Sequence, residues 1–289
     1  MSTTNALNVG LEPLLNRIFN EDCLEGMKRI PDGSVDLILC DLPYGTTQCA
    51  WDSIIPFEQL WAQYERIIKG NGAIVLTAAQ PFTSALIMSN PKLFKYSWIW
   101  EKSKATGYLN AKKRPLCAHE DILVFAKKSP VYFPQMTEGK PYNKGTALRP
   151  TAVYGSQKET TVKNDDGKRC PRSVQYFKTA ESEGLVVHPT QKPLRMFEYL
   201  VNTYTKPGDV VLDNCMGSGT TAHACINLQR NFIGFEKDAA FKDIICNRLT
   251  PILPTFEFVN STPTIIEPKR SRPIGPIPAS IANEVCACP

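Results

Sequence analysis

One segment near the end of the chain sets narrow limits on what it can fold into. Residues 210–213 (Val-Val-Leu-Asp) are apolar enough for a buried strand, and they lead into a turn with two glycines, Gly217 and Gly219, before a helical stretch begins at Thr220. Glycine lets the backbone approach a ligand closely, and the free amide groups at the start of a helix point toward it. A strand, a glycine turn and a helix in this order are typical of α/β folds that bind nucleotides.

The same alternation of strands and helices runs through most of the chain. Apolar runs predict strands, and apolar residues at helical spacing predict the helices between them. The run at 35–40 is almost wholly apolar, which favours a buried parallel strand. This pattern indicates an α/β fold. The expected strands are residues 17–22, 35–40, 73–77, 96–100, 121–126, 210–213 and 232–236, and the expected helices are 24–30, 57–69, 194–204, 220–228 and 239–249.

The chain changes character between residues 129 and 184. Proline, glycine, lysine and polar residues dominate there and regular periodicity is lost. A loop of that length inside a compact domain is usually functional. We therefore divide the chain into a flexible N-terminus (1–14), two parts of one enzyme-sized domain (15–128 and 186–255), an insertion between them (129–185) and a flexible tail (263–289).

Composition argues against a membrane protein and against a metal site. No stretch comes close to the roughly 20 apolar residues that span a bilayer, and residues 1–10 lack the basic and apolar segments of a signal peptide. We therefore expect a soluble intracellular protein with no membrane contact. The ten cysteines include no Cys-x-x-Cys pair and there are only three histidines, so we expect no bound metal.

The positive charge of the chain is grouped. The formal net charge of +5 is too modest to indicate nucleic acid by itself, but residues 112–114, 127–128, 168–172 and 269–272 each hold two or three basic side chains. Each group alone is more often a solvated surface. Together they permit a polyanionic partner.

A second motif, the tetrapeptide Asp-Leu-Pro-Tyr at 41–44, follows the apolar run at 35–40. Ligands bind at the carboxyl ends of the strands in parallel sheets, and Asp41 stands at such an end. Alone, the tetrapeptide is more simply a proline turn. However, Glu236 ends the strand after the glycine turn, a little over twenty residues beyond Asp213, where an acidic side chain can take the hydroxyls of a ribose.

Together these segments resemble the amino-methyltransferase family of DNA-modifying enzymes. Its catalytic signature, Asp/Asn/Ser-Pro-Pro-Tyr/Phe, is similar to residues 41–44, and its cofactor signature, Phe-x-Gly-x-Gly, is similar to residues 215–219. The catalytic motif comes first, as in the β class of the family. Leu42 replaces the first proline of the signature, and Cys215 replaces the usual phenylalanine. Family segments are also matched at residues 20–23, 188–193 and 232–237, so the resemblance covers residues 17–249.

The resemblance implies a fold, a cofactor and partners. The fold would be a Rossmann-like methyltransferase sheet, mostly parallel with one antiparallel hairpin strand, and with an inserted irregular target-recognition region at 129–185. Residues 15–128 would form its catalytic half and residues 186–255 its cofactor-binding half. The enzyme would be cytoplasmic, encoded by a bacterium, an archaeon or a phage, and would use S-adenosylmethionine to methylate double-stranded DNA. Homodimerisation and a cognate restriction endonuclease stay open.

The catalytic residues implied by the resemblance are Asp41, Leu42, Pro43 and Tyr44. We expect Asp41 and the backbone carbonyl of Leu42 to accept hydrogen bonds from the amino group of a base, which orients the nitrogen toward the methyl donor. Pro43 biases residue 42 toward an extended conformation. The base must first be flipped out of the duplex, and stacking on Tyr44 would return about 1–3 kcal/mol.

Glu236 is expected to hold the ribose of the cofactor and Asp22 to lie near its adenine ring, with Asp213, the glycine turn and Lys192 around its methionine end. Lys192 could equally be an exposed lysine at the start of a helix. The full set of expected cofactor residues is Asp22, Cys23, Lys192, Asp213, Cys215, Gly217, Ser218, Gly219, Thr220, Thr221 and Glu236. The basic residues expected to contact DNA are Lys112, Lys113, Arg114, Arg149, Lys168, Arg169 and Arg172.

Three alternatives stay open at this point. The aspartate at position 41 favours N6 of adenine, because the cytosine-N4 enzymes of the family more often carry serine there. A protein or RNA methyltransferase with an Asn-Pro-Pro-Tyr site usually has the cofactor motif first, whereas here it comes last. A catalytically inactive DNA-binding relative would have little reason to keep Asp41, Tyr44 and Glu236.

Overall fold

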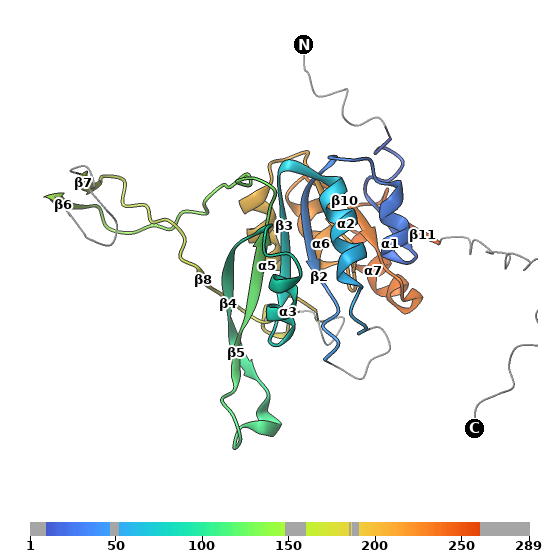
Figure 1. Cartoon of the computed structure of the whole chain (residues 1–289), viewed down its shortest axis with the longest axis horizontal. Helices are drawn as coiled ribbons and strands as arrows, with labels where there is room; N and C mark the ends of the chain where they lie inside the picture. Colours follow the sequence, from blue (N-terminus) through green and yellow to red (C-terminus); the bar gives the residue numbers. More distant parts are fainter. Residues whose placement is uncertain (1–9, 47–51, 148–159, 185, 187–190, 261–289) are drawn as a thin grey trace, which may run out of the picture.

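The central element of the protein is a sheet that, in the described part of the chain, has nine strands in the order β11-β1-β10-β9-β2-β3-β5-β4-β8 (Figure 1). The computed structural model describes residues 10–46, 52–147, 160–184, 186 and 191–260. The strands are β1 (Arg17–Asn20), β2 (Val35–Asp41), β3 (Ile68–Ala78), β4 (Phe94–Thr106), β5 (Cys117–Phe125), β8 (Val174–Phe177), β9 (Val210–Asp213), β10 (Asn231–Phe235) and β11 (Glu257–Asn260).

The sheet is mostly parallel. Of the strand pairs recorded between described residues of this sheet, only those of β5 with β3 and with β4 are antiparallel. β4 and β5 form a hairpin, which needs no crossover helix, whereas parallel neighbours need one. The expected Rossmann-like sheet with one antiparallel hairpin strand is confirmed.

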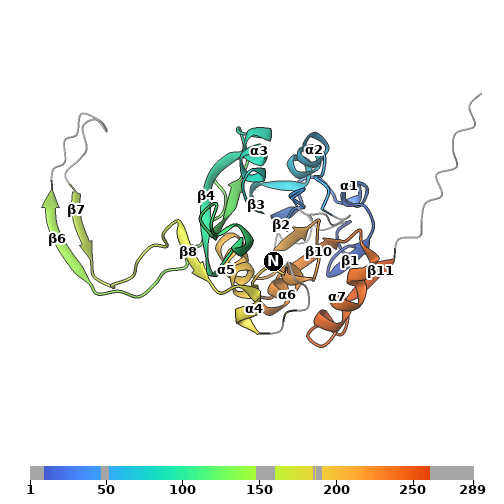
Figure 2. The ribbon, with the colours of Figure 1, turned by 90° about the horizontal axis from the view of Figure 1, so that it is seen from below.

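Helices cover both faces of the sheet (Figure 2). The first face is covered by α1 (Cys23–Gly26), α2 (Phe57–Ile67) and α3 (Phe82–Ser89), and the second by α5 (Leu194–Tyr204), α6 (Thr220–Asn227) and α7 (Lys242–Leu249). Short 3-10 turns, η1 (Met27–Arg29) and η3 (Ala239–Phe241), adjoin α1 and α7.

β2 shows why a strand in the middle of this sheet reads as a continuous apolar run. Its side chains alternate between the two layers: Ile38 and Cys40 pack with the first set of helices, and Leu37 and Leu39 pack with the second. All four are fully buried. A strand covered on both faces has no solvent side that could carry polar residues.

The strand order brings the two motifs to one edge of the sheet. β2 and β9 are parallel neighbours, with Leu37 opposite Val211. The chain continues from β9 to β10 on one side and from β2 to β3 on the other. The carboxyl ends that carry Asp41 and Asp213 therefore flank the point where the order of strands diverges, which is where ligands bind in open α/β sheets.

The insertion has more regular structure than its sequence predicts. β6 (Tyr142–Ala147) and β7 (Thr160–Asn164) form a separate antiparallel ribbon that projects away from the sheet in both views (Figures 1 and 2). β8 then returns to pair with β4 at the edge of the main sheet, and α4 (Ala180–Glu183) follows it. These strands are short and mostly exposed, so their sequences lack the alternation of apolar and polar residues that would predict a strand.

Other differences from the expected elements also have physical causes. The predicted helix at 57–69 ends at Ile67, because Ile68 is already extended and begins β3. Two further elements were not predicted from the sequence: α3, whose apolar residues run on without a clear helical period, and β11, a four-residue strand. Among the described residues no helix is long and apolar enough to cross a bilayer. The expected flexible tail and most of the expected flexible N-terminus lie outside the described residues.

Candidate active site

The carboxyl ends of β2 and β9 open into one cavity of about 810 Å³. Residues 41–44 line it on one side and residues 213–218 on the other, so two segments that are far apart in the chain meet across a shared space. Sites for small molecules and cofactors usually measure about 300–1,000 Å³. The cavity is therefore large enough for a nucleoside-sized ligand.

Asp41 is the last residue of β2, and both oxygens of its carboxylate accept hydrogen bonds. Oδ1 accepts from the hydroxyl of Tyr44, at 2.7 Å, and from the hydroxyl of Thr77 on β3. Oδ2 accepts from Nζ of Lys192, at 2.8 Å. Asp41 and Thr77 are directly opposite each other on parallel neighbours, so the sheet itself holds the threonine beside the carboxylate. Three donors from three parts of the chain thus fix the orientation of Asp41.

Tyr44 is half-buried, and its ring stacks on Phe82 of α3 with 5.1 Å between ring centroids and 24° between ring planes. Burial, together with the charge of Asp41, raises the pKa of Tyr44 well above its ordinary value. The phenol therefore stays protonated and donates to Asp41. Phe82 was not among the expected site residues, because nothing in the sequence near it marks it as a neighbour of the tetrapeptide.

The other two residues of the tetrapeptide have different environments. Leu42, which stands where the family has its first proline, is only 4% exposed and packs with the core under the first set of helices. Pro43 is half-buried and lines the cavity. The leucine side chain thus fits as an apolar core contact, and the substitution leaves the tetrapeptide beside the cavity.

Lys192 lies at the centre of a buried ionic network. Its Nζ contacts Asp41 and lies 3.5 Å from Oε2 of Glu120 on β5, while Oε1 of Glu120 pairs with Nζ of Lys102 at 2.6 Å. Burial alone would lower the pKa of Lys192, but Asp41, Tyr44 and Glu120 outweigh it, and the pKa rises well above its usual value. Lys192 is therefore a buried cation and not an exposed lysine at a helix start. Glu120 and Lys102 are site residues that the sequence analysis missed.

At the opposite end of the cavity, Glu236 follows β10 and is held by backbone amides. Its Oε2 accepts from the amide of Gly217, at 2.7 Å, and its Oε1 from the amide of Asp238, at 2.9 Å. Glu236 is 9% exposed, and burial raises the pKa of its carboxyl. Asp22 lies nearby as the N-cap of α1, where its Oδ1 accepts from the amide of Leu24 at 2.9 Å.

The two glycines of the turn have different tasks. Both adopt positive φ angles, +52° at Gly217 and +80° at Gly219, which residues other than glycine rarely adopt. Gly217 lines the cavity, whereas Gly219 caps α6 and faces Ile245 and Leu249 of α7. Gly219 is thus the one expected cofactor residue that does not line the cavity, because its position serves the start and packing of the helix.

Asp213 stabilises the turn from below. Its Oδ1 accepts from the amide of Cys215, at 3.0 Å, and its Oδ2 from the hydroxyl of Thr221 on α6. It is only 3% exposed, and burial raises its pKa to about 6. Asp213 therefore ties the strand, the turn and the helix together.

Cys215, which stands in place of the family's phenylalanine, belongs to a small thiol cluster on the cavity wall. Asn214 Nδ2 lies 3.5 Å from its sulfur and 3.6 Å from that of Cys23. Contacts with the thiols of Cys23 and Cys40, together with burial, raise the pKa of Cys215 well above its usual value. The thiol therefore stays protonated and acts as a small apolar wall.

The family model described as DNA methylase, which covers N6 and N4 enzymes, matches residues 35–247. This is most of the chain. The protein belongs to the N6/N4 DNA methylase family.

Individual relatives of this DNA methylase support the assignment to the family. It is 27% identical over 248 residues to the Type II methyltransferase M1.MboII of Moraxella bovis, covering 78% of this chain and 94% of the relative. It is 29% identical over 255 residues to the Type II methyltransferase M.BglII of Bacillus subtilis, covering 80% and 68%. The crystal structure of the M1.HpyAVI–SAM complex superposes with a TM-score of 0.57 at 26% identity, covering 81% of this chain and 98% of the other.

The protein is therefore a site-specific DNA methyltransferase, and S-adenosylmethionine is its cofactor. The cavity fits that molecule. Each oxygen of Glu236 accepts one backbone amide and keeps a further lone pair that a ribose hydroxyl can use. A side-chain carbon added at Gly217 would meet nothing closer than 3.9 Å, so the backbone there is open to a ligand. The expected cofactor residues that line the cavity are Asp22, Cys23, Lys192, Asp213, Cys215, Gly217, Ser218, Thr220, Thr221 and Glu236.

The basic residues expected to contact DNA lie in two places. Lys112, Lys113 and Arg114 are exposed at the tip of the β4–β5 hairpin, just after the short turn η2 (Tyr108–Asn110), and the hairpin extends beyond the sheet (Figure 1). Tyr108 and Leu109 at the same tip are 82% and 96% exposed. Neither residue is among the expected DNA contacts, although large apolar side chains between basic residues are a usable signal.

The other basic candidates belong to the insertion. Lys168 and Arg172 are exposed. Arg169 is instead engaged within the protein: its guanidinium donates to Asn164 Oδ1 at 3.0 Å and lies 4.8 Å from the centroid of the Tyr142 ring. It therefore fastens the base of the β6–β7 ribbon. Arg149, like residues 188–190 of the expected 188–193 motif, lies outside the described residues.

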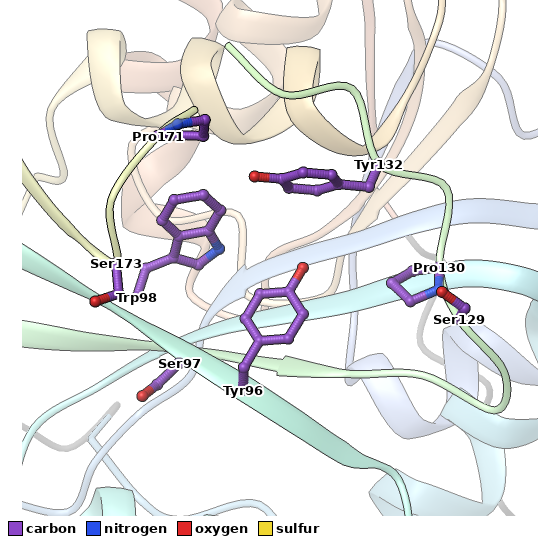
Figure 3. Close-up of a pocket in the computed structure, with 8 residues that line it drawn as sticks. All are labelled: Tyr96, Ser97, Trp98, Ser129, Pro130, Tyr132, Pro171 and Ser173. Carbon is purple, nitrogen blue, oxygen red and sulfur yellow. The ribbon is translucent and has the colours of Figure 1, made fainter. Parts of the chain in front are cut away.

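A second cavity, of about 470 Å³, lies where the insertion leaves and rejoins the sheet (Figure 3). Tyr96, Trp98 and Tyr132 line it, and the rings of Trp98 and Tyr132 stack with centroids 6.4 Å apart. Trp98 Nε1 donates to the hydroxyl of Tyr204 on α5 at 2.7 Å. The remaining lining residues are serines and prolines, so no charged group of the described part of the chain lines this cavity. The aromatic side chains around this cavity hold the insertion against the sheet. Its described lining residues include none of the carboxylates and lysines that line the first cavity.

Proposed function

We propose that this methyltransferase transfers a methyl group to the exocyclic N6 of adenine in double-stranded DNA, after the adenine has been flipped out of the duplex. The observation that supports this most directly is the shared cavity, with Asp41 and Tyr44 on one side and the glycine turn and Glu236 on the other. A base bound beside Asp41 would face a cofactor bound beside the turn.

The amino group of adenine is a weak nucleophile because its lone pair is delocalised into the ring. Asp41 and the backbone carbonyl of Leu42 would each accept a hydrogen bond from this group, which directs the nitrogen lone pair out of the ring plane. Asp41 also places negative charge where positive charge develops on the nitrogen, and its three donors hold it in position before the substrate arrives.

The cofactor end of the cavity would act by orientation. S-adenosylmethionine supplies the electrophilic methyl group. Glu236 would hold the ribose hydroxyls, Asp22 would lie by the adenine ring and the open backbone at Gly217 would admit the methionine end. Lys192, which the resemblance had placed with the cofactor, contacts Asp41 instead, so we assign it to the catalytic end.

Base flipping costs a few kcal/mol, and the cavity offers an aromatic surface that can offset much of this. Stacking on Tyr44 would contribute about 1–3 kcal/mol. Phe82 lies against the ring of Tyr44 and so keeps it in a fixed orientation for the incoming base.

Contacts with the duplex are proposed for two surfaces. The tip of the β4–β5 hairpin adjoins the mouth of the cavity, since Thr106 near its end still lines it, and its basic side chains would bind phosphates. The insertion, with Lys168, Arg172 and Arg149, would read the target sequence. A cognate restriction endonuclease is a proposed partner because the relatives are named Type II methyltransferases, and a homodimer is a proposed assembly.

The test is to identify the product. The purified chain is incubated with unmethylated plasmid DNA and S-adenosylmethionine labelled in the methyl group, and the DNA is digested to nucleosides for mass spectrometry. We expect labelled N6-methyladenine from the parent and from Asp243→Ala, an exposed aspartate on α7, and none from Asp41→Ala.

Each other outcome has a clear meaning. N4-methylcytosine would overturn the choice of adenine and keep the amino-directed mechanism. Full methyl transfer by Asp41→Ala would overturn the role of the carboxylate. Cofactor binding without any methylated nucleoside from the parent would favour an inactive DNA-binding relative.

A further inference from the structure

Glu120 has one buried carboxylate oxygen without a hydrogen bond. Its Oε1 is paired with Lys102, but Oε2 accepts no hydrogen bond from any residue that the structure describes. The nearby ammonium of Lys192 lies 3.5 Å away, in ion-pair contact but beyond a good hydrogen bond. A buried charged oxygen left in this state is unfavourable, so its persistence calls for an explanation.

Lys192 lies beside two carboxylates. Its Nζ is 2.8 Å from Oδ2 of Asp41, and a shift of less than 1 Å toward Glu120 would bring it to the same distance from Oε2 of Glu120. Its Nζ is also 5.4 Å from the centroid of the Tyr44 ring, in the region that the target base would enter. Lys192 thus lies between the carboxylate of Asp41, the ring of Tyr44 and Oε2 of Glu120, which accepts no hydrogen bond from a described residue.

Methyl transfer is disfavoured by a cation that stays on Asp41. Positive charge develops on the amino nitrogen during the reaction, and the negative charge of Asp41 stabilises it only if that charge is not already neutralised. An ammonium 2.8 Å from Asp41 neutralises much of it and would repel the developing cation. The reaction therefore gains if Lys192 moves away from Asp41 once the base is bound.

We propose that Glu120 is a positioning residue that receives Lys192 when the target amino group binds Asp41. This rests on the proposed function. In the structure Lys192 compensates the charge of the half-buried Asp41. When the amino group replaces the lysine on Asp41, the ammonium transfers its hydrogen bond to Glu120 Oε2. Lys102 and the burial of Glu120, whose side chain is 14% exposed, hold that acceptor in place. Only hydrogen bonds change partner, and no covalent bond forms or breaks.

The first test is Glu120→Gln, which keeps the shape of the side chain and removes its charge. Lys192 would then have no anion to move to. The rate of methyl transfer measured in a single turnover is expected to fall about 10- to 150-fold, the range for loss of a hydrogen bond to a charged group. The dissociation constant for S-adenosylmethionine should stay within about twofold of the parent's, since Glu120 lies at the catalytic end. Glu101→Gln is the matched control, because Glu101 is exposed on the neighbouring strand β4, opposite His119, and should leave the rate unchanged.

The second test removes the lysine. Lys192→Met is expected to retain at least about a tenth of the parent rate, since Asp41 is then free of its counter-ion, and adding Glu120→Gln to it should change the rate less than about twofold. A purely structural network, or a direct contact between Glu120 and the base, would keep the effect of Glu120→Gln in the Lys192→Met background, and either result would overturn the proposal. Complete loss of transfer in Lys192→Met alone would overturn it too, because the lysine would then be needed on Asp41.

The two levels of inference fail differently. A parent protein that produces no methylated adenine refutes the proposed function itself. An active parent whose rate is unaffected by Glu120→Gln refutes only the role of Glu120.

Discussion

Replacing Glu236 by glutamine should weaken both cofactor binding and the stability of the fold, and the two effects can be measured separately. Each oxygen of the Glu236 carboxylate already accepts a hydrogen bond from a backbone amide. Gly217 and Asp238 each donate an amide to a different oxygen, at 2.7 and 2.9 Å. A glutamine side chain has one acceptor oxygen and one NH2 group. In Glu236→Gln one of the two backbone amides must therefore face the NH2 group of the glutamine, and that amide loses its acceptor.

Two magnitudes follow. A buried amide without an acceptor costs about 1–3 kcal/mol, and this affects the unfolding free energy with or without ligand. Binding loses one charge-assisted hydrogen bond to the ribose, about 1.5–3 kcal/mol, which corresponds to an increase of roughly 10- to 150-fold in the dissociation constant for S-adenosylmethionine. The two losses are independent because the amide is unsatisfied in both the free and the bound protein.

Calorimetric titration with S-adenosylmethionine and urea denaturation of the free protein measure the two quantities. Glu257→Gln is the matched control: this glutamate is exposed on β11 and pairs with Arg17 at 2.8 Å. It should change neither quantity by more than about 0.5 kcal/mol. A folded Glu236→Gln protein with unchanged cofactor affinity would refute the assignment of Glu236 to the ribose.

Three further predictions concern the rest of the site. Burial raises the pKa of Asp213 to about 6, above its unfolded value, so the ionised form destabilises the fold. Relative to Asp213→Asn, the parent should gain about 1.4 kcal/mol as the pH falls from about 8 to about 5, and a difference in Tm between the two proteins that is equal at both pH values would contradict this. Tyr44→Phe keeps the stack on Phe82 but loses the bond to Asp41, so kcat should fall about tenfold, whereas Tyr44→Ala should also raise KM for DNA; identical kinetics for the two variants would exclude a stacking role. Replacing the three basic residues of the hairpin tip by alanine should weaken DNA binding and reduce its dependence on salt, by about 0.9 in the logarithmic slope for each phosphate that is no longer bound, and an unchanged slope would remove the tip from the DNA surface. These three residues are Lys112, Lys113 and Arg114.

Much of the sheet could be predicted from the sequence because its central strands are covered on both faces. β2 and β9 have no solvent side, so their residues form apolar runs that are visible without any structure. The two strands of this sheet that were missed, β8 and β11, are short and lie at its edges. There the pairing with a neighbouring strand, rather than the composition of the segment, decides whether a strand forms.

The sequence by itself determined the two motifs and their order, because tetrapeptide and glycine turn are each continuous in the chain and follow strands that can be recognised. Only the tertiary structure decided which other side chains complete the site. Thr77, Phe82 and Glu120 come from three separate elements, and their distance from Asp41 depends on the order and direction of the strands. The antiparallel course of β5 brings the start of that strand, with Glu120, to the edge where β2 ends. Contacts across a sheet depend on that arrangement and not on spacing along the chain, so the local sequence carries no signal for them.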